Sequence, residues 1–407
     1  MIVKQIIEGK KLTLIGPKTD LEGIFHGAFY YYLIAIPYFI GKGNPSIPAF
    51  LIAFINAVGT IFTFLIGKRL SPLSRTGAAL IYAFSFQGIV FSRWLSNPSL
   101  VIPLSTILLL LITNKFTSTN FILSILIWGI IFHLEIASGV FLVPVLIFYL
   151  IVNIKKINLR LFLYSFVIFL LVFSPFIIFD LRHNHLLSKA IFTFFFNHPP
   201  SLSIFSLINI LGIAKASLRE FNLHFLPQYN HLSSFIFGIS FLVLILKIKN
   251  TFNKIILLWL VSPFIFLFPL KSVSLSQTLV HLSPAFYILV GLLVDKFIKI
   301  TRNQILIIEI LVLFSILNFI YNIQRIPNNE SFFFRSYQYT FLGDQKKTID
   351  FIYKEAGEEK FSFDYYTFPY WLPQGWNYLF EYYGKKKYGY LPITGQRTKT
   401  FFCNHRT

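Results

Sequence analysis

Long apolar runs separated by short basic segments dominate this chain. The clear runs lie at 47–67, 76–91, 98–113, 119–132, 137–153, 161–179, 233–246, 255–270, 279–294 and 305–321. Helices that cross a bilayer need about 20 mostly apolar residues, and flanking residues can extend the shorter runs. Proline and glycine interrupt several runs, which membrane helices tolerate. The pattern therefore predicts an all-α polytopic membrane protein with about ten transmembrane helices.

Composition supports a membrane location. Of the 407 residues, 55% are hydrophobic, and the mean hydropathy is +0.67. A soluble domain this apolar could not cover its core with polar surface. The net charge of +20 would suggest nucleic acid in a soluble protein, but here most of the surplus sits in short loops between apolar runs. Because basic loops at membrane edges are ordinary, we expect no nucleic-acid partner and take the lipid bilayer as the first partner.

The basic loops also predict the orientation of the chain. Alternate loops carry thirteen Lys and Arg residues, and the short loops between them carry only Arg93 and Lys271. The thirteen are Lys68, Arg69, Arg75, Lys115, Lys155, Lys156, Arg160, Lys247, Lys249, Lys254, Lys296, Lys299 and Arg302. The positive-inside rule places these loops in the cytoplasm. We therefore expect a multi-pass protein of the plasma membrane, with the stretch 180–232 and the C-terminal region outside.

Two regions are predicted, 1–325 in the membrane and 326–407 beyond it. Past Tyr321 the chain becomes polar and aromatic, and 360–390 alternates in a way that indicates a small α/β unit. The segment 24–40 allows two interpretations. Its proline and its tyrosines favour a flat helix at the membrane surface. The lysines among the first twenty residues favour a further span with Met1 inside.

Polar residues that are unusual at membrane ends gather on the predicted outer face. They follow successive spans: Arg93 and Asn97, His133 and Glu135, Asp180, Arg182 and His183, and Lys271. Each of these residues also has an ordinary structural explanation that involves no ligand. Arg93, Arg182 and Lys271 could anchor at headgroups, His133 and Glu135 could pair with each other, and His183 could be solvated. Their convergence on one face is the more informative observation.

A cationic pocket at the membrane edge suits a ligand that carries a phosphate and a lipid tail. Arginine binds phosphate through two parallel hydrogen bonds. A phosphate leaving group gains negative charge as its bond to carbon breaks, so cations placed there stabilise the transition state. Disulfides and cysteine metal clusters within the chain are excluded, because Cys403 is the only cysteine. We predict no cofactor and no metal ligands, although a role for a divalent metal stays open.

Several motifs resemble GT-C-type membrane glycosyltransferases. These are the run 14–19 (LIGPKT), 23–32 (GIFHGAFYYY), 67–70 (GKRL), Phe91-Ser92-Arg93-Trp94 with Asn97-Pro98, and 179–183 (FDLRH). The chain is similar over about residues 1–325 to the family-39-like branch, which is related to protein mannosyltransferases and lipid A aminoarabinose transferases. The resemblance implies the GT-C fold, with amphipathic helices on the outer surface, and thereby favours a flat 24–40 helix.

The resemblance also implies an activity. Such enzymes transfer a sugar from a polyprenyl-phosphate donor to an acceptor hydroxyl of a glycan, lipid or protein on the outer side. On this basis Arg93, His133, Arg182, His183 and Lys271 are expected to bind the donor phosphate. Glu135, Asp180 and Asn97 are expected to orient those groups. His26, Tyr30 and Tyr31 are expected to line the sugar or acceptor site, or else to form an aromatic belt.

The chain departs from the family pattern at its beginning. The family's first helix and its acidic base are expected upstream of Met1, because Asp20 and Glu22 come too late to be that motif. Asn97 also stands where many relatives carry an acid, and Ala28 where a proline is common. Two alternatives therefore stay open: a non-catalytic or truncated membrane protein, and a flippase or transporter of lipid-linked sugars. The second would need polar residues at mid-membrane depth.

Overall fold

The structure is a computed structural model that describes residues 2–19, 21–197, 204–267, 278–325, 342–357, 360–365, 374–393 and 401–404. Helices make up most of the described chain. The bundle helices are α3 (Ser46–Ile66), α4 (Pro72–Phe84), α5 (Phe86–Ser92), α6 (Val101–Thr113), α7 (Ser118–Leu134), α8 (Ile136–Phe141), α9 (Val143–Asn153), α10 (Leu159–Arg182), α12 (Ile204–His224), α13 (Asn230–Leu246), α14 (Thr251–Leu267), α15 (Ser283–Thr301) and α16 (Gln304–Arg325). Short 3₁₀ turns join them: η1 (Gly67–Arg69), η2 (Asn97–Leu100), η3 (Ile154–Lys156) and η4 (Val280–Leu282).

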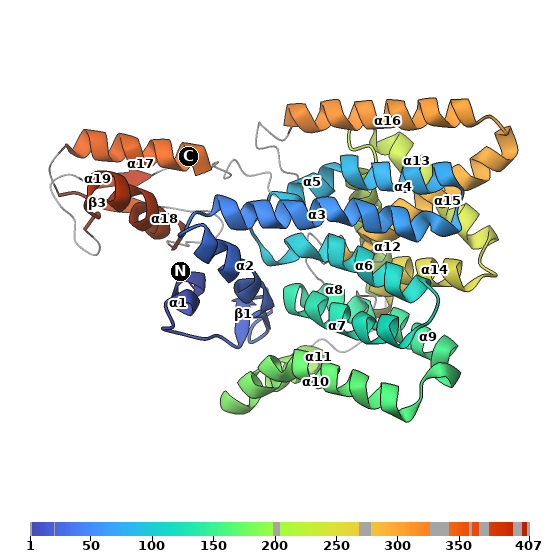
Figure 1. Ribbon diagram of the computed structural model, residues 1–407, viewed down its shortest axis with the longest axis horizontal. Helices are drawn as coiled ribbons and strands as arrows, with labels where there is room; N and C mark the ends of the chain where they lie inside the picture. The colour runs from blue at the N-terminus through green and yellow to red at the C-terminus, as the bar shows by residue number, and fades with distance from the viewer. Residues whose placement is uncertain are drawn as a thin grey trace.

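The basic loops meet at one end of the bundle, which is at the right in Figure 1. Contacts confirm this arrangement, because Arg69, Lys115, Lys156 and Thr251 line one shared pocket although they come from four different loops. We call this the basic end and the other the opposite end. α1 (Ile2–Ile7), the strands β1 (Ile15–Lys18) and β2 (Phe25–Gly27), and α2 (Phe29–Ile40) lie toward the opposite end (Figure 1).

Within the described residues, the predicted apolar runs fall on helices that differ in length, and residues 268–270 of the run 255–270 lie outside the described part. Four of the described helices are long and apolar enough, by length and composition, to cross a membrane: Ser46–Arg69, Ile136–Lys156, Leu159–Arg182 and Gln304–Arg325. Four predicted runs lie on shorter apolar helices, Asn97–Thr113, Ser118–Leu134, Asn230–Leu246 and Thr251–Leu267. Run 76–91 is broken between α4 and α5 at Ser85. α10 and α16 expose long apolar faces, with Leu171 63% exposed, as lipid-facing helices do.

The segment 24–40 folds as β2 followed by the 12-residue helix α2. At about 1.5 Å per residue such a helix is roughly 18 Å long, short of the roughly 30 Å of a bilayer core. α2 contains Pro37 and exposes Ile36, Phe39 and Ile40. Its length and its position at the end of the bundle favour the flat helix over the further span.

One bundle helix was not predicted as a span. α12 comes from the stretch 180–232, which has mixed polarity and was expected to lie outside the membrane. Its C-terminal half is instead packed among α5, α13, α14 and α15, and Phe221 and His224 are almost fully buried. The mixed polarity has a physical reason, because Glu220 and His224 of α12 pair inside the bundle while Lys215 and Arg219 are exposed.

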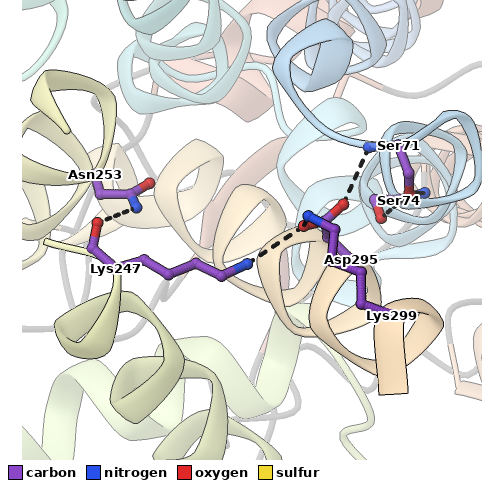
Figure 2. A network of polar contacts seen from close by, with 6 residues as sticks. All are labelled: Ser71, Ser74, Lys247, Asn253, Asp295 and Lys299. Atoms are coloured by element: carbon purple, nitrogen blue, oxygen red, sulfur yellow. Dashed lines mark hydrogen bonds and ion pairs between the residues drawn. The ribbon is translucent and has the colours of Figure 1, made fainter. Parts of the chain in front are cut away.

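A buried carboxylate holds three segments together at the basic end (Figure 2). Asp295 of α15 accepts hydrogen bonds from the Ser71 backbone amide (3.3 Å), Lys247 Nζ (3.3 Å) and Lys299 Nζ (2.9 Å). Asn253 closes the adjacent loop by donating to the Lys247 carbonyl at 2.6 Å. Asp295 therefore joins the start of α4 and the end of α13 to the end of α15, and it neutralises two of the cations of this end.

The C-terminal residues form a small separate core. It consists of α17 (Leu342–Ala356), β3 (Ser362–Tyr365), α18 (Gln374–Leu379), the π-helical turn η5 (Phe380–Gly384), α19 (Lys385–Tyr388) and β4 (Phe401–Asn404). β3 and β4 pair in parallel, so the unit is α/β as predicted. Tyr353, Phe361 and Phe380 pack at its centre. The unit contacts the N-terminal segment through the ion pair of Lys4 with Glu381 and the ring pair of Tyr38 with Tyr378.

We predict that Asp295→Asn lowers the stability of the bundle by about 1–3 kcal/mol, because the Lys247 ammonium loses its anionic partner. Lys299→Gln is the matched control. The Lys299 side chain is 66% exposed, so its ion pair contributes little. The measurement is the thermal unfolding midpoint of the purified protein in detergent. Equal midpoints for the two variants would show that Asp295 does not join these segments.

We predict an acid-dependent loss of order in the C-terminal unit, centred on Asp350 of α17. Burial raises the pKa of this carboxyl, but hydrogen bonds from Lys387, Tyr388 and Tyr383 outweigh it and hold the pKa below its usual value. The stabilisation is therefore present above about pH 4 and lost as pH falls through the lowered pKa. Hydrogen exchange of α17–α19 should show this loss, and Asp350→Asn should loosen the unit at neutral pH. Glu355→Gln, an exposed acid on the same helix, should leave exchange unchanged.

Candidate functional site at the opposite end

A short antiparallel hairpin closes over the ends of two bundle helices. β1 and β2 pair with Ile15 opposite Gly27 and Lys18 opposite Phe25. Phe25 meets Phe179 of α10 edge to face, with ring centroids 5.7 Å apart. Gly27 lies directly against His133 of α7, so closely that a Cβ on Gly27 would come within 1.9 Å of His133 Nδ1. The motif 23–32 is therefore seated on α7 and α10, and it carries His26 and Tyr30 to this end.

His133 joins the hairpin to both helices. Its Nε2 donates a hydrogen bond to the Val172 carbonyl of α10 at 2.7 Å, and its ring packs on Phe176 with centroids 4.7 Å apart. With the proton on Nε2, the Nδ1 facing Gly27 is left as an acceptor. This geometry makes His133 a residue that positions the hairpin. Its predicted contact with a donor phosphate stays a prediction.

The Asp180 side chain bonds to the first turn of the next helix, α11 (Leu186–Asn197). Its Oδ1 accepts from the backbone amides of Leu187 (2.8 Å) and Ser188 (3.1 Å), and its Oδ2 accepts from Ser188 Oγ at 2.5 Å. Its Oδ2 also lies 3.6 Å from His185 Nδ1. These contacts fix the turn 183–185, in which Asn184 and His185 have positive φ. Among the described residues, Asp180 therefore orients His185 and α11 rather than Arg182.

Arg182 and His183 end α10 and are both exposed. The His183 ring stacks on Phe179 at 4.0 Å, and its Nδ1 donates to the Phe179 carbonyl at 2.8 Å. Phe179 thus sits between Phe25 of the hairpin and His183. The exposed Arg182 and His183 thus follow closely on the residue that packs against the hairpin.

Arg93 and Asn97 belong to the neighbouring loop. Arg93 caps the C-terminus of α5 and stays exposed at the surface, although burial of part of its guanidinium lowers its pKa. Asn97 begins η2, is 5% exposed, and its amide nitrogen has no hydrogen-bond partner in the described part of the chain. η2 is fixed to α3 because Asn56 Nδ2 donates to the Ser99 carbonyl at 3.0 Å. η2 also contacts α7, so this loop lies beside the helix that carries His133.

Glu135 occupies the break between α7 and α8 and is buried. Three residues later, Ser138 Oγ donates to the Thr278 carbonyl at 3.2 Å, which ties this break to η4.

Lys271 lies outside the described residues. Tyr30 is buried in the bundle core and Tyr31 is half-buried beside it, with ring centroids 6.4 Å apart. The structure thus gathers His26, His133, Arg182 and His183 around the hairpin, with Arg93 and Asn97 in the adjoining loop.

Sequence reasoning missed a polar network inside the bundle. His224 of α12 lies between three hydroxyls: its Nδ1 is 2.7 Å from Ser85 Oγ and 2.9 Å from the Tyr287 hydroxyl, and its Nε2 is 2.9 Å from Ser283 Oγ. One turn earlier, Glu220 accepts from Gln87 Nε2 at 3.0 Å. The signal available in the sequence was the spacing of Glu220 and His224, four residues apart, which places both on one face of a helix.

In the described residues, no group of three or more His, Cys, Asp or Glu side chains is arranged to hold a metal ion. Arg182, exposed beside the hairpin, supplies a positive charge and hydrogen-bond donors. A guanidinium suits an anion, and a phosphate in particular.

No family model and no curated protein matches this chain. Among solved structures, it is similar to ArnT from Cupriavidus metallidurans, in the apo state and bound to undecaprenyl phosphate. Each superposes with a TM-score of 0.47 at 13% identity over 72% of this chain. The chain spans 58% of the apo ArnT chain and 54% of the lipid-bound one.

We predict that Gly27→Ala displaces the hairpin and destabilises the protein by about 1–3 kcal/mol, because the added methyl group overlaps the His133 ring. Gly238→Ala is the control, since a Cβ at Gly238 of α13 meets nothing within 4 Å. In the double variant Gly27→Ala with His133→Ala the overlap is gone, so its cost should be well below the sum of the two single variants. Thermal unfolding in detergent measures all four proteins. Additive effects, or a Gly27→Ala that behaves like Gly238→Ala, would contradict the packing described.

Proposed function

We propose that this protein is a membrane glycosyltransferase that moves a sugar from a polyprenyl-phosphate donor to an acceptor hydroxyl at the opposite end of the bundle. The observation that carries the proposal is the hairpin 15–27 seated on His133 and Phe179, with Arg182 and His183 at its rim. In this proposal, the exposed Arg182 guanidinium at the edge of the apolar bundle is within reach of a lipid phosphate. Most of the motifs that resemble GT-C glycosyltransferases lie at this end, whereas the motif 67–70 lies at the basic end.

In this proposal Arg182 and Arg93 bind the donor phosphate. Guanidinium groups suit this role because they stay charged at all physiological pH and match two phosphate oxygens at once. Transfer breaks the bond between the sugar C1 and the phosphate oxygen and forms a bond from C1 to the acceptor oxygen. The phosphate keeps the electron pair, so its charge rises in the transition state, and the two arginines stabilise that charge. The acceptor proton passes to a base that we do not assign.

The remaining residues position these groups. His133 holds the hairpin against α7 and α10, and Asp180 fixes the turn after Arg182. The buried amide of Asn97 has a free donor beside the Arg93 loop and can bind a phosphate or sugar oxygen. His26, Tyr30 and Tyr31 lie on the segment that closes the site, where aromatic faces can pack on a sugar ring. Lys271 is the remaining cation of the proposed phosphate site. We propose that this site lies on the extracytoplasmic side, because the positive-inside rule puts the basic loops in the cytoplasm.

A second candidate function is a flippase for lipid-linked sugars. The observation that favours it is the network of His224 with Ser85, Ser283 and Tyr287, together with Glu220 and Gln87, inside the bundle. Polar groups within a membrane bundle can mark a transport path. The two functions separate cleanly, because a flippase moves the labelled lipid between leaflets without releasing polyprenyl phosphate.

The test measures binding of undecaprenyl phosphate to the purified protein and transfer from radiolabelled polyprenyl-phosphate sugars in proteoliposomes. Removing one charge-assisted contact should weaken lipid binding roughly tenfold in Arg182→Gln and in Arg93→Gln. Arg160→Gln is the matched control, because Arg160 and Arg182 lie near the two ends of the same helix and are both exposed. Equal loss in Arg160→Gln would contradict the proposed site. Lipid translocation without transfer, across a broad panel of donors, would favour the flippase.

A further inference from the structure

A pocket at the basic end has a composition that calls for an anionic ligand. Its volume is about 220 Å³, and it lies between the ends of α6, α9 and α14 and the turn η1. Arg69, Lys115 and Lys156 line it, and the aromatic rings of Phe116, Tyr149 and Phe252 form much of the remaining wall. None of the described residues that line this pocket is acidic.

Two of the three cations have neutral neighbours. The Arg69 guanidinium lies 5.6 Å above the Phe252 ring, and Lys156 Nζ lies 5.5 Å from the Phe116 ring and 3.0 Å from Asn153 Oδ1. Elsewhere at the basic end, cations are paired with an acid, because Asp295 neutralises Lys247 and Lys299. Three positive charges around one pocket repel each other unless an anion is bound between them.

Tyr149 supplies an independent observation. This residue lines the same pocket and is only 3% exposed, and its hydroxyl has no hydrogen-bond partner within the described residues. A buried hydroxyl without a partner is costly, so an acceptor oxygen is expected there. Thr251, the first residue of α14, also lines the pocket, and helix N-termini favour anions.

The surroundings of the pocket indicate that its ligand has an apolar part. Val152 lines the pocket and is 46% exposed, and Ile151 beside it is 65% exposed. Both belong to α9, whose outward face is apolar and faces lipid in a membrane. A ligand whose phosphate sits among Arg69, Lys115 and Lys156 would therefore have acyl chains able to lie along α9 without crossing polar surface.

We propose that this pocket binds the phosphate of an anionic glycerophospholipid from the leaflet at the basic end. The Arg69, Lys115 and Lys156 side chains hold the phosphate oxygens and the Tyr149 hydroxyl donates to one of them. Basic pockets between membrane helices are a recognised way to bind anionic headgroups. The proposal does not rest on the glycosyltransferase activity, because the pocket lies at the other end of the bundle from the hairpin.

The experiment titrates the detergent-purified protein with phosphatidylglycerol and with phosphatidylcholine of the same acyl chains, followed by native mass spectrometry. Wild type should prefer phosphatidylglycerol. Each cation removed should weaken that binding roughly fivefold, so Arg69→Gln, Lys115→Gln and Lys156→Gln combined should abolish the preference. Tyr149→Phe should weaken it about two- to tenfold. The control triple, Lys249→Gln, Lys254→Gln and Lys296→Gln, removes the same charge from outside the pocket and should keep the preference.

Three results would overturn the proposal: equal binding of the two lipids by wild type, equal loss in the two triple variants, or full displacement of phosphatidylglycerol by inorganic phosphate at matched concentration. The last would assign the pocket to a soluble phosphate. If the pocket triple fails to fold, Tyr149→Phe and the single Lys156→Gln test the same site. Undecaprenyl phosphate binding should be unchanged in Tyr149→Phe, so failure of this site and failure of the proposed function are distinguishable.

Discussion

A helix inside a bilayer must satisfy the hydrogen-bonding groups of its own backbone. Where the helix is broken, other polar groups of the protein must bond to the backbone groups that the break leaves without a partner. The break at Ser85, between α4 and α5, shows how this chain meets that requirement. Ser85 Oγ accepts from the Gly88 amide at 2.9 Å and contacts His224 Nδ1, and His224 in turn contacts Ser283 and Tyr287. The break thus brings α12 and α15 against α5. The packing of α12 into the bundle, and the position of the Arg93 loop that follows α5, both depend on it.

The two ends of the bundle are built differently because they meet different partners. At the basic end, Asp295 gathers the loops around one buried carboxylate, while three other cations surround a pocket without an acid. At the opposite end, the loops are closed by side chains that pack on a short hairpin. Gly27 lets the hairpin approach His133, and Phe179 lies between Phe25 and His183. We propose anionic headgroups as the partner of the first end and a polar ligand carried by a lipid as the partner of the second.

The bundle could largely be predicted from the sequence, because apolar runs and basic loops follow directly from the bilayer. The course of α12 could not, since Lys215, Arg219 and Glu220 within it look like loop residues until the structure shows Glu220 paired with Gln87. The site residues stay a prediction, and their roles could not be read from the sequence. Hydrogen bonds decide whether a histidine or an acid binds ligand or supports the fold, and the contacts of His133 with Val172 and of Asp180 with Leu187 cross elements that no local pattern connects.

The central claim is that the basic end faces the cytoplasm and the hairpin end faces outward. Cys403 is the only cysteine, so Cys403→Ser gives a background in which single cysteines report sidedness. Leu95→Cys, in the Arg93 loop, and Lys249→Cys, at the basic end, are both at exposed positions. In right-side-out vesicles, a membrane-impermeant maleimide should label position 95 and not position 249. Labelling of 249 alone would reverse the orientation and contradict the account.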